Sequence, residues 1–184
     1  MFSLRVDDEI ELGLYEERHA QALFELTDRS REHIREWLPW VDGSTTVEAS
    51  RNFIKISLKQ YAENDGLAVG IWYKGELAGT ASFHYFDWHT RRTEIGYWLG
   101  QEFTGKGLMT RAVRRLVEYG FDELNLNRIE IRCAPGNRKS RAIPERLGFT
   151  AEGTLRQVGF IHDNILVDMV VYGLLKDEWA ANPK

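Results

Sequence analysis

Cysteine is nearly absent from this chain of 184 residues, and the single Cys133 cannot form a disulfide within the chain. A small secreted scaffold held together by disulfides is therefore excluded. No apolar run approaches the ~18 residues that a membrane span needs. Acidic residues already occur at Asp7, Asp8 and Glu9, where a signal peptide would have a basic start. We therefore expect a soluble, cytoplasmic protein with no membrane partner.

An excess of basic residues is also missing, because 24 Lys and Arg stand against 28 Asp and Glu, for a formal net charge of −4. Nucleic-acid binders usually present a basic face, so we expect no nucleic-acid partner. The histidines and the cysteine show no zinc-ligand spacing, so we expect no metal. There are only four prolines, and no repeat or linker. The chain therefore reads as a single domain over residues 1–184.

Apolar periodicity predicts an α/β fold. Residues 4–14 alternate as in a strand or a bent hairpin, residues 16–40 have helical spacing, and Thr45 begins a capping-box pattern for a helix to about Tyr61. An amphipathic helix should begin near Leu108, and another should end at Gly148. Further strands are expected at 67–73, 77–86, 93–99, 128–134, 155–161 and 165–174. We expect a mixed sheet of about seven strands with helices on both faces.

The loop between the 93–99 strand and the following helix contains Gly105 and Gly107. Glycines let backbone N–H groups approach a ligand closely, and a helix N-terminus favours negative charge, so the loop suits a phosphate. Gly100 to Lys106 also spells G-x-x-x-x-G-K, but a nucleotide-binding P-loop needs Ser or Thr where Gly107 stands. A glycine turn that only packs the helix on the sheet is a third interpretation.

Several segments resemble the GNAT acetyltransferase superfamily over most of the chain. Residues 104–109 fall on its acyl-CoA loop, Q/R-x-x-G-x-G/A, with Thr104 and Met109 as departures. Residues 31–41, 94–99 and 105–110 are similar to the branch that acetylates the N-termini of ribosomal proteins. Residues 137–140, followed by 147–149, match the second CoA motif of that branch. The resemblance implies the GNAT fold and an N-acetyltransferase that transfers acetyl directly from acetyl-CoA to an amine.

The resemblance also implies how acetyl-CoA binds. The pyrophosphate would lie on the backbone of the glycine loop, and the pantetheine arm would run along the 93–99 strand, with a backbone N–H of the Trp98–Leu99 segment as oxyanion donor. Lys106 would assist a phosphate or remain solvated. The CoA-binding residues expected on this basis are Trp98, Leu99, Thr104, Gly105, Lys106, Gly107, Leu108, Met109, Thr110, Asn137 and Ser140.

Two side chains are candidates for the proton transfers. Many relatives protonate the departing thiolate with a tyrosine at the position of Pro144, which has no proton to donate; Ser140 is then the best acid, and it is equally suited to cap a helix. A cap at Ser140 is preferred to one at Asn137, because the earlier start puts Pro144 inside the helix at a cost of ~3 kcal/mol. Glu94 is the candidate base, with a solvated strand-end glutamate as the alternative. The glutamate that relatives carry after an Arg-Gln pair is Gly159 here.

The acceptor side is expected to include His33, Trp37, Trp40 and Tyr85, although aromatics at helical spacing also suit a core. A site with a poor base suits an α-amine, whose pKa is about 7.7–8.0, better than a lysine, whose pKa is about 10.4. The expected acceptors are, in falling order, a protein N-terminus, a small amine such as an antibiotic, aminoacyl conjugate or polyamine, and a lysine. A non-catalytic acyl-CoA sensor is the alternative from another class, and a homodimer is compatible with the aromatic-rich helices.

Overall fold

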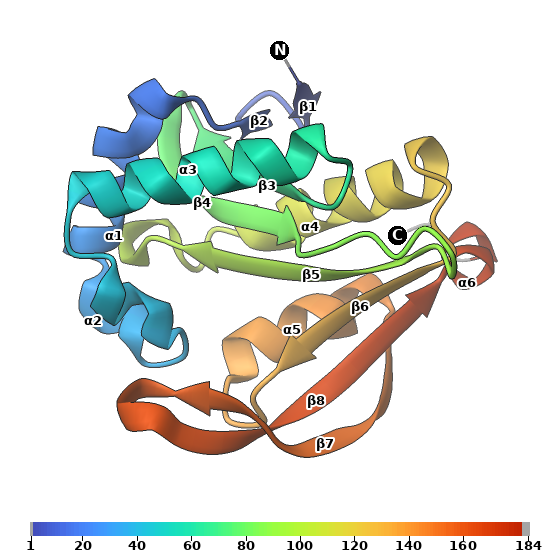
Figure 1. The fold of residues 1–184 in the computed structure, drawn as a ribbon. Helices are drawn as coiled ribbons and strands as arrows, with labels where there is room; N and C mark the ends of the chain where they lie inside the picture. The colour runs from blue at the N-terminus through green and yellow to red at the C-terminus, as the bar shows by residue number, and fades with distance from the viewer. Residues whose placement is uncertain (1, 182–184) are drawn as a thin grey trace.

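The computed structural model describes residues 2–181, and its centre is one eight-stranded sheet in the order β1-β2-β3-β4-β5-β6-β8-β7 (Figure 1). Neighbouring strands are antiparallel except for β5 and β6, which are parallel. The expected mixed sheet is therefore confirmed. The strands are β1 (Ser3–Arg5), β2 (Ile10–Leu14), β3 (Leu67–Tyr73), β4 (Glu76–Phe83), β5 (Arg92–Leu99), β6 (Arg128–Cys133), β7 (Thr150–Ile161) and β8 (Ile165–Leu175).

The eighth strand arises because residues 4–14 form a hairpin. Asp7 makes the turn, since its side chain accepts hydrogen bonds from the backbone N–H groups of Glu9 and Ile10 at 2.8 and 2.9 Å. Such a local side-chain bond favours a turn over a continuous strand. Of the two forms predicted for this segment, the bent hairpin is the one observed.

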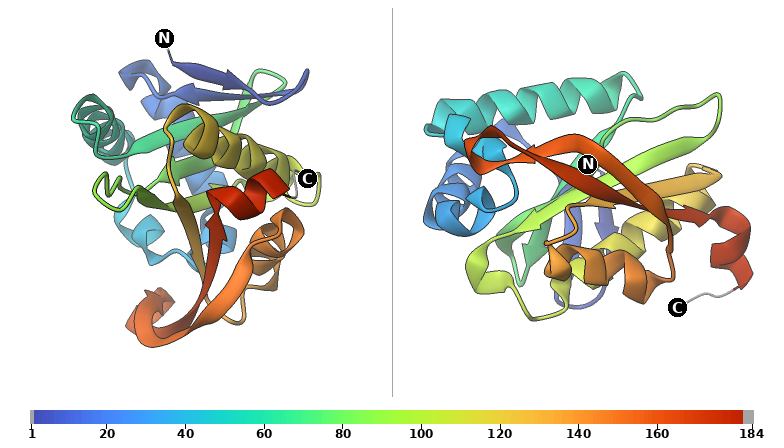
Figure 2. Two further views of the ribbon diagram at one scale, coloured as in Figure 1. Left: turned by 90° about the vertical axis from the view of Figure 1, so that its right-hand side faces the viewer. Right: turned by 90° about the horizontal axis from the view of Figure 1, so that it is seen from below.

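Helices cover both faces of the sheet (Figures 1 and 2). The first three α-helices lie on one face, and α4 and α5 lie on the other, where α4 buries Leu108, Ala112, Val113, Leu116 and Val117. The helices are α1 (Ala20–Arg29), α2 (Arg31–Arg35), α3 (Val47–Ala62), α4 (Leu108–Glu118), α5 (Arg138–Leu147) and α6 (Lys176–Ala181). Short turns of helix are η1 (Glu17–His19), η2 (Pro39–Gly43), η3 (Gln101–Phe103), η4 (Tyr119–Glu123) and η5 (His162–Asn164). No helix in residues 2–181 is long and apolar enough to cross a membrane.

Two predicted helix starts were wrong. The cap of α3 is Thr46, not Thr45, and its hydroxyl accepts a hydrogen bond from the Ala49 N–H at 3.1 Å. The cap of α5 is Asn137, not Ser140: Asn137 Oδ1 accepts the Ser140 N–H at 3.1 Å. Pro144 therefore does lie inside α5, at a position where a proline costs about 3 kcal/mol when nothing compensates.

Candidate active site

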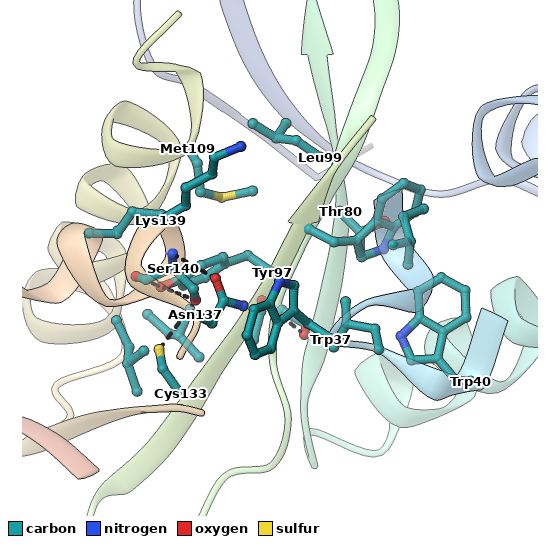
Figure 3. A pocket seen from close by; sticks show the side chains of 18 of the residues that line it. Trp37, Trp40, Thr80, Tyr97, Leu99, Met109, Cys133, Asn137, Lys139 and Ser140 are labelled. Atoms are coloured by element: carbon teal, nitrogen blue, oxygen red, sulfur yellow. Dashed lines mark hydrogen bonds between the residues drawn. The ribbon is translucent and has the colours of Figure 1, made fainter. Parts of the chain in front are cut away.

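The site forms where β5 and β6 diverge. The two strands pair only at their beginnings, where Arg92–Glu94 lies against Arg128–Glu130. Beyond that point a cavity of about 1200 Å³ extends from the glycine loop before α4, past the start of α5, to the segment that joins α2 and η2 (Figure 3). One continuous space therefore touches the predicted CoA-binding loop and three of the four predicted acceptor residues, His33, Trp37 and Trp40.

The hydrogen-bond pattern of β5 decides which backbone groups face this gap. Gly100 N–H donates to the Ala78 carbonyl, and His84 N–H donates to the Glu94 carbonyl. The register between β4 and β5 is unbroken, and N–H directions alternate along an antiparallel pair. Trp98 N–H therefore points to β4, whereas the N–H groups of Tyr97 and Leu99 point to the gap. The Leu99 N–H therefore remains a candidate oxyanion donor, and the Tyr97 N–H is a second one. The Trp98 N–H is not a candidate, because it points to β4.

The glycine loop has the backbone that its sequence predicts. Gly105 and Gly107 have φ values of 77° and 73°, in the left-handed region that other residues enter only with strain. A Cβ added at either glycine would meet no atom within 4 Å, and no side chain caps α4 at Gly107. The first N–H groups of α4 are thus left for a ligand, as an anion site at a helix N-terminus requires. Thr104, Leu108, Met109 and Thr110 also line the cavity.

Of the two alternatives predicted for Lys106, the structure shows the solvated side chain, because the residue is exposed. Its ammonium lies 5.5 Å from the ring centre of Phe103 and 5.8 Å from that of Tyr73, within the range of cation–π attraction. The residue does not line the cavity. The side chain turns back onto the aromatic surface beside β3, so only the Lys106 backbone belongs to the loop.

Ser140 lies at the gap, on the third residue of α5. Because Asn137 caps the helix through the Ser140 backbone N–H, the Ser140 hydroxyl is not needed as a cap. Its Oγ is 3.2 Å from Cys133 Sγ and donates to the Tyr97 hydroxyl at 3.3 Å. Of the two interpretations of Ser140, general acid and helix cap, the cap is supplied by Asn137, so the Ser140 side chain is available for chemistry. Asn137 also lines the cavity, with its side-chain oxygen already bonded to the helix.

Tyr97 is the residue that the sequence analysis missed as a side chain. It donates from its hydroxyl to the Ser140 backbone carbonyl at 2.9 Å. Burial first, and then the neighbouring Cys133 thiol, hold the pKa of Tyr97 well above its usual range, so the phenol stays protonated. Burial also raises the pKa of the Cys133 thiol, so this residue packs in the core as a neutral thiol.

Tryptophan side chains form the wall of the cavity that faces Ser140 and the start of α5. The rings of Trp40 and Trp98 are 5.7 Å apart, and a Cβ on Gly136 would lie only 3.1 Å from the Trp37 ring. Trp37 therefore reaches across to the loop that precedes α5 (Figure 3). His33 lines the same cavity, and burial followed by the nearby Lys139 lowers its pKa, so its imidazole is neutral near pH 7.

Glu94 lines the far end of the cavity, away from the CoA loop. Its carboxylate is 3.5 Å from His84 Nδ1 and 3.3 Å from Arg132 Nε. Four residues of strand, about 13 Å, separate it from Trp98. That span is well beyond direct hydrogen-bond reach, so a base at Glu94 would act through water.

Tyr85 does not line the cavity, contrary to the prediction, whereas the preceding His84 does. The strand β4 ends at Phe83, so the chain turns away from the groove just before Tyr85. The imidazole of His84 lies over Gly96, where an added Cβ would be 2.0 Å from Nε2. The glycine at position 96 is what lets this histidine lie on the floor of the groove.

A buried carboxylate beside Glu94 gives a pH-dependent prediction. Burial acts to raise the pKa of Glu130, but hydrogen bonds from Arg128 and Arg132 outweigh it, and the pKa lies below its ordinary 4.5. A lowered folded-state pKa contributes stability above the unfolded pKa, which is lost as pH falls through the folded value. Glu130→Gln should therefore cost about 1–3 kcal/mol at pH 7, with the difference shrinking below about pH 4. Urea unfolding from pH 7 to pH 3 measures it; a difference that stays constant over this range would contradict the prediction.

An open strand edge beside an anion-binding helix start is the architecture of an acyl-CoA-dependent transferase. Residues 10–150 match the family model described as the acetyltransferase (GNAT) domain. The chain belongs to this family, and it is an N-acetyltransferase that uses acetyl-CoA. The P-loop interpretation is therefore wrong. In residues 2–181 no group of His, Cys, Asp or Glu side chains is placed to hold a metal ion.

Relatives with similar sequences and structures extend over nearly the whole chain. The Bacillus subtilis protein named "Putative ribosomal N-acetyltransferase YdaF" is 41% identical over 97% of this chain and 98% of its own length. The microcin C7 self-immunity acetyltransferase MccE, solved with acetyl-CoA and AMP, is 30% identical with a TM-score of 0.90, covering 94% of this chain and 95% of that one. The ribosomal L7/L12 α-N-protein acetyltransferase RimL, solved with coenzyme A, is 25% identical with a TM-score of 0.92, covering 96% and 99%.

Proposed function

We propose that this enzyme acetylates the N-terminal α-amine of a protein. The observation that carries the proposal is the single cavity in which the glycine loop, Ser140 and the Trp37–Trp40 wall meet. Acetyl-CoA enters from the loop side, and a peptide N-terminus enters from the aromatic side. The names of YdaF and RimL, which refer to ribosomal substrates, support a ribosomal protein as the acceptor.

Each proposed chemical role belongs to a group that faces the gap. The N–H groups of Tyr97 and Leu99 bind the pantetheine amides and stabilise the charge that develops on the thioester oxygen. The amine attacks the thioester carbon, the C–S bond breaks, and the Ser140 hydroxyl gives its proton to the departing thiolate. Glu94 accepts the proton of the attacking amine through water, and water returns a proton to Ser140.

The state of the amine favours an N-terminus over a lysine. A peptide α-amine has an ordinary pKa of about 7.7–8.0, so a large share is neutral near pH 7.5, whereas lysine at about 10.4 is almost fully charged. A base that acts only through water suits the α-amine. We also consider a small aminoacyl conjugate, because MccE was solved with AMP and three tryptophans here offer surfaces for stacking.

The test is thiol release from acetyl-CoA with matched acceptors. Peptides that begin with Ser or Ala should be acetylated at their N-termini, and the same peptides with a blocked N-terminus and an internal lysine should not. For the free peptides kcat/KM should rise with pH and level off near about pH 8, as the amine loses its proton. Acetylation of an aminoacyl nucleotide or a polyamine, with none of the peptides, would overturn the proposal in favour of a small-molecule acceptor.

A further inference from the structure

Pro144 removes one backbone hydrogen bond from α5. It is the seventh residue of the helix Arg138–Leu147. In a regular helix the N–H of residue 144 would donate to the carbonyl of Ser140, four residues earlier. Proline has no N–H, so this carbonyl must find another donor or remain unpaired inside the protein.

The replacement donor comes from the sheet. Tyr97, on β5, donates its hydroxyl hydrogen to the Ser140 carbonyl at 2.9 Å. Because its only hydrogen is used in that bond, its oxygen remains free to accept, and the Ser140 hydroxyl donates to it at 3.3 Å. One phenol therefore holds both the main chain and the side chain of Ser140.

We propose that Tyr97 is a positioning residue that fixes the Ser140 hydroxyl at the gap between β5 and β6. Tyr97 can bond to the Ser140 carbonyl because Pro144 leaves that carbonyl without its helical donor. Rotation about the Cβ–Oγ bond then turns the Ser140 hydrogen from the Tyr97 oxygen toward the thiolate without moving Oγ. The inference rests on the proposed function, in which Ser140 protonates the thiolate.

The matched control is Tyr172, a second tyrosine that bonds to α5. Its hydroxyl donates to Glu145 at 2.7 Å and accepts from Arg141 at 2.8 Å. It does not line the cavity, and its hydroxyl bonds are to residues other than Ser140. Tyr172→Phe removes two tyrosine–helix bonds, to residues of α5 that do not line the cavity, and should lower the unfolding temperature without changing kcat.

The experiment compares Tyr97→Phe, Pro144→Ala and the double variant, in unfolding temperature and in steady-state kinetics. Tyr97→Phe should lower both the unfolding temperature and kcat, the latter by about tenfold, with the KM for acetyl-CoA unchanged. In the Pro144→Ala background the N–H of residue 144 pairs the carbonyl, so Tyr97→Phe should cost less stability there. The kcat should stay low in the double variant, because the Ser140 hydroxyl still lacks its anchor.

Three results would overturn the inference. Recovery of kcat together with stability in the double variant would make Tyr97 purely structural, and so would a loss of kcat in Tyr172→Phe equal to that in Tyr97→Phe. Adding Tyr97→Phe to Ser140→Ala should lower kcat no further, and a further loss would mean that Tyr97 acts independently of Ser140. Full turnover by Ser140→Ala alone would instead remove the proposed acid, a failure of the proposed function that this variant identifies separately.

Discussion

Gly107→Ala is expected to weaken the binding of acetyl-CoA about 10- to 100-fold, the size of effect that follows from losing one or two hydrogen bonds to a charged group. Gly107 has a φ of 73° and stands immediately before α4. An alanine there strains the backbone by about 1–2 kcal/mol. Its Cβ also enters open space in the cavity that Gly107 lines, next to the uncapped start of α4. Calorimetric titration with acetyl-CoA measures the loss.

Gly75→Ala is the control that separates strain from binding. Gly75 makes the turn between β3 and β4 with a φ of 83°, and an added Cβ there would also meet nothing within 4 Å. It does not line the cavity. Both variants should lose similar stability, but only Gly107→Ala should lose affinity. Equal affinities for acetyl-CoA in the two variants would contradict the assignment of the loop.

The glycine loop could be predicted from the sequence because its chemistry is local. Gly105 and Gly107 stand between a strand pattern and a helix pattern, and only glycine takes their backbone angles without strain. The same holds for the sheet and the helices on its two faces, which follow from apolar periodicity. Features that depend on neighbours close in the chain were therefore recovered, apart from the start of α3, where the cap lies one residue later than predicted.

The start of α5 could not be predicted, because the deciding contact joins residues 43 positions apart. In the sequence alone, the hydrogen bond lost at Pro144 is an uncompensated cost, which favours a cap at Ser140 over one at Asn137. Tyr97 supplies the missing donor from β5, so the cost that argued against Asn137 is offset. No pattern around Pro144 carries that information.

The directions of some side chains and backbone N–H groups were also predicted wrongly, because they too depend on contacts between residues far apart in the chain. Trp98 and Tyr97 are adjacent, and only the pairing of β5 with β4 shows which N–H faces the gap. Lys106 lies beside an aromatic ring of β3 that is more than 30 residues away in the chain. Tyr85 was expected in the groove because it lies near the turn before the Glu94 strand. The structure gives that place to His84.

Ser140→Ala is expected to lower kcat about 100-fold at pH 7, the lower end of what a general acid contributes. The KM for acetyl-CoA should change little, because the glycine loop and the edge of β5 still bind it. The unfolding temperature should also change little, since the α5 cap uses the Ser140 backbone N–H and not its hydroxyl. Steady-state kinetics and thermal unfolding of one preparation measure all three quantities.

The pH dependence and a second variant identify the cause of that loss. A thiol has an ordinary pKa of about 8.5, so the thiolate leaves without a proton more readily above that pH, and the defect of Ser140→Ala should narrow there. Asn137→Ala should lose more stability and less kcat than Ser140→Ala does. It removes the helix cap, which costs about 1 kcal/mol of stability, and it leaves the Ser140 hydroxyl in place. A Ser140→Ala enzyme whose kcat matches the wild type at pH 7 would contradict the role of Ser140. The thiolate would then take its proton from water, and the bonds between Tyr97 and Ser140 would serve only to complete the helix.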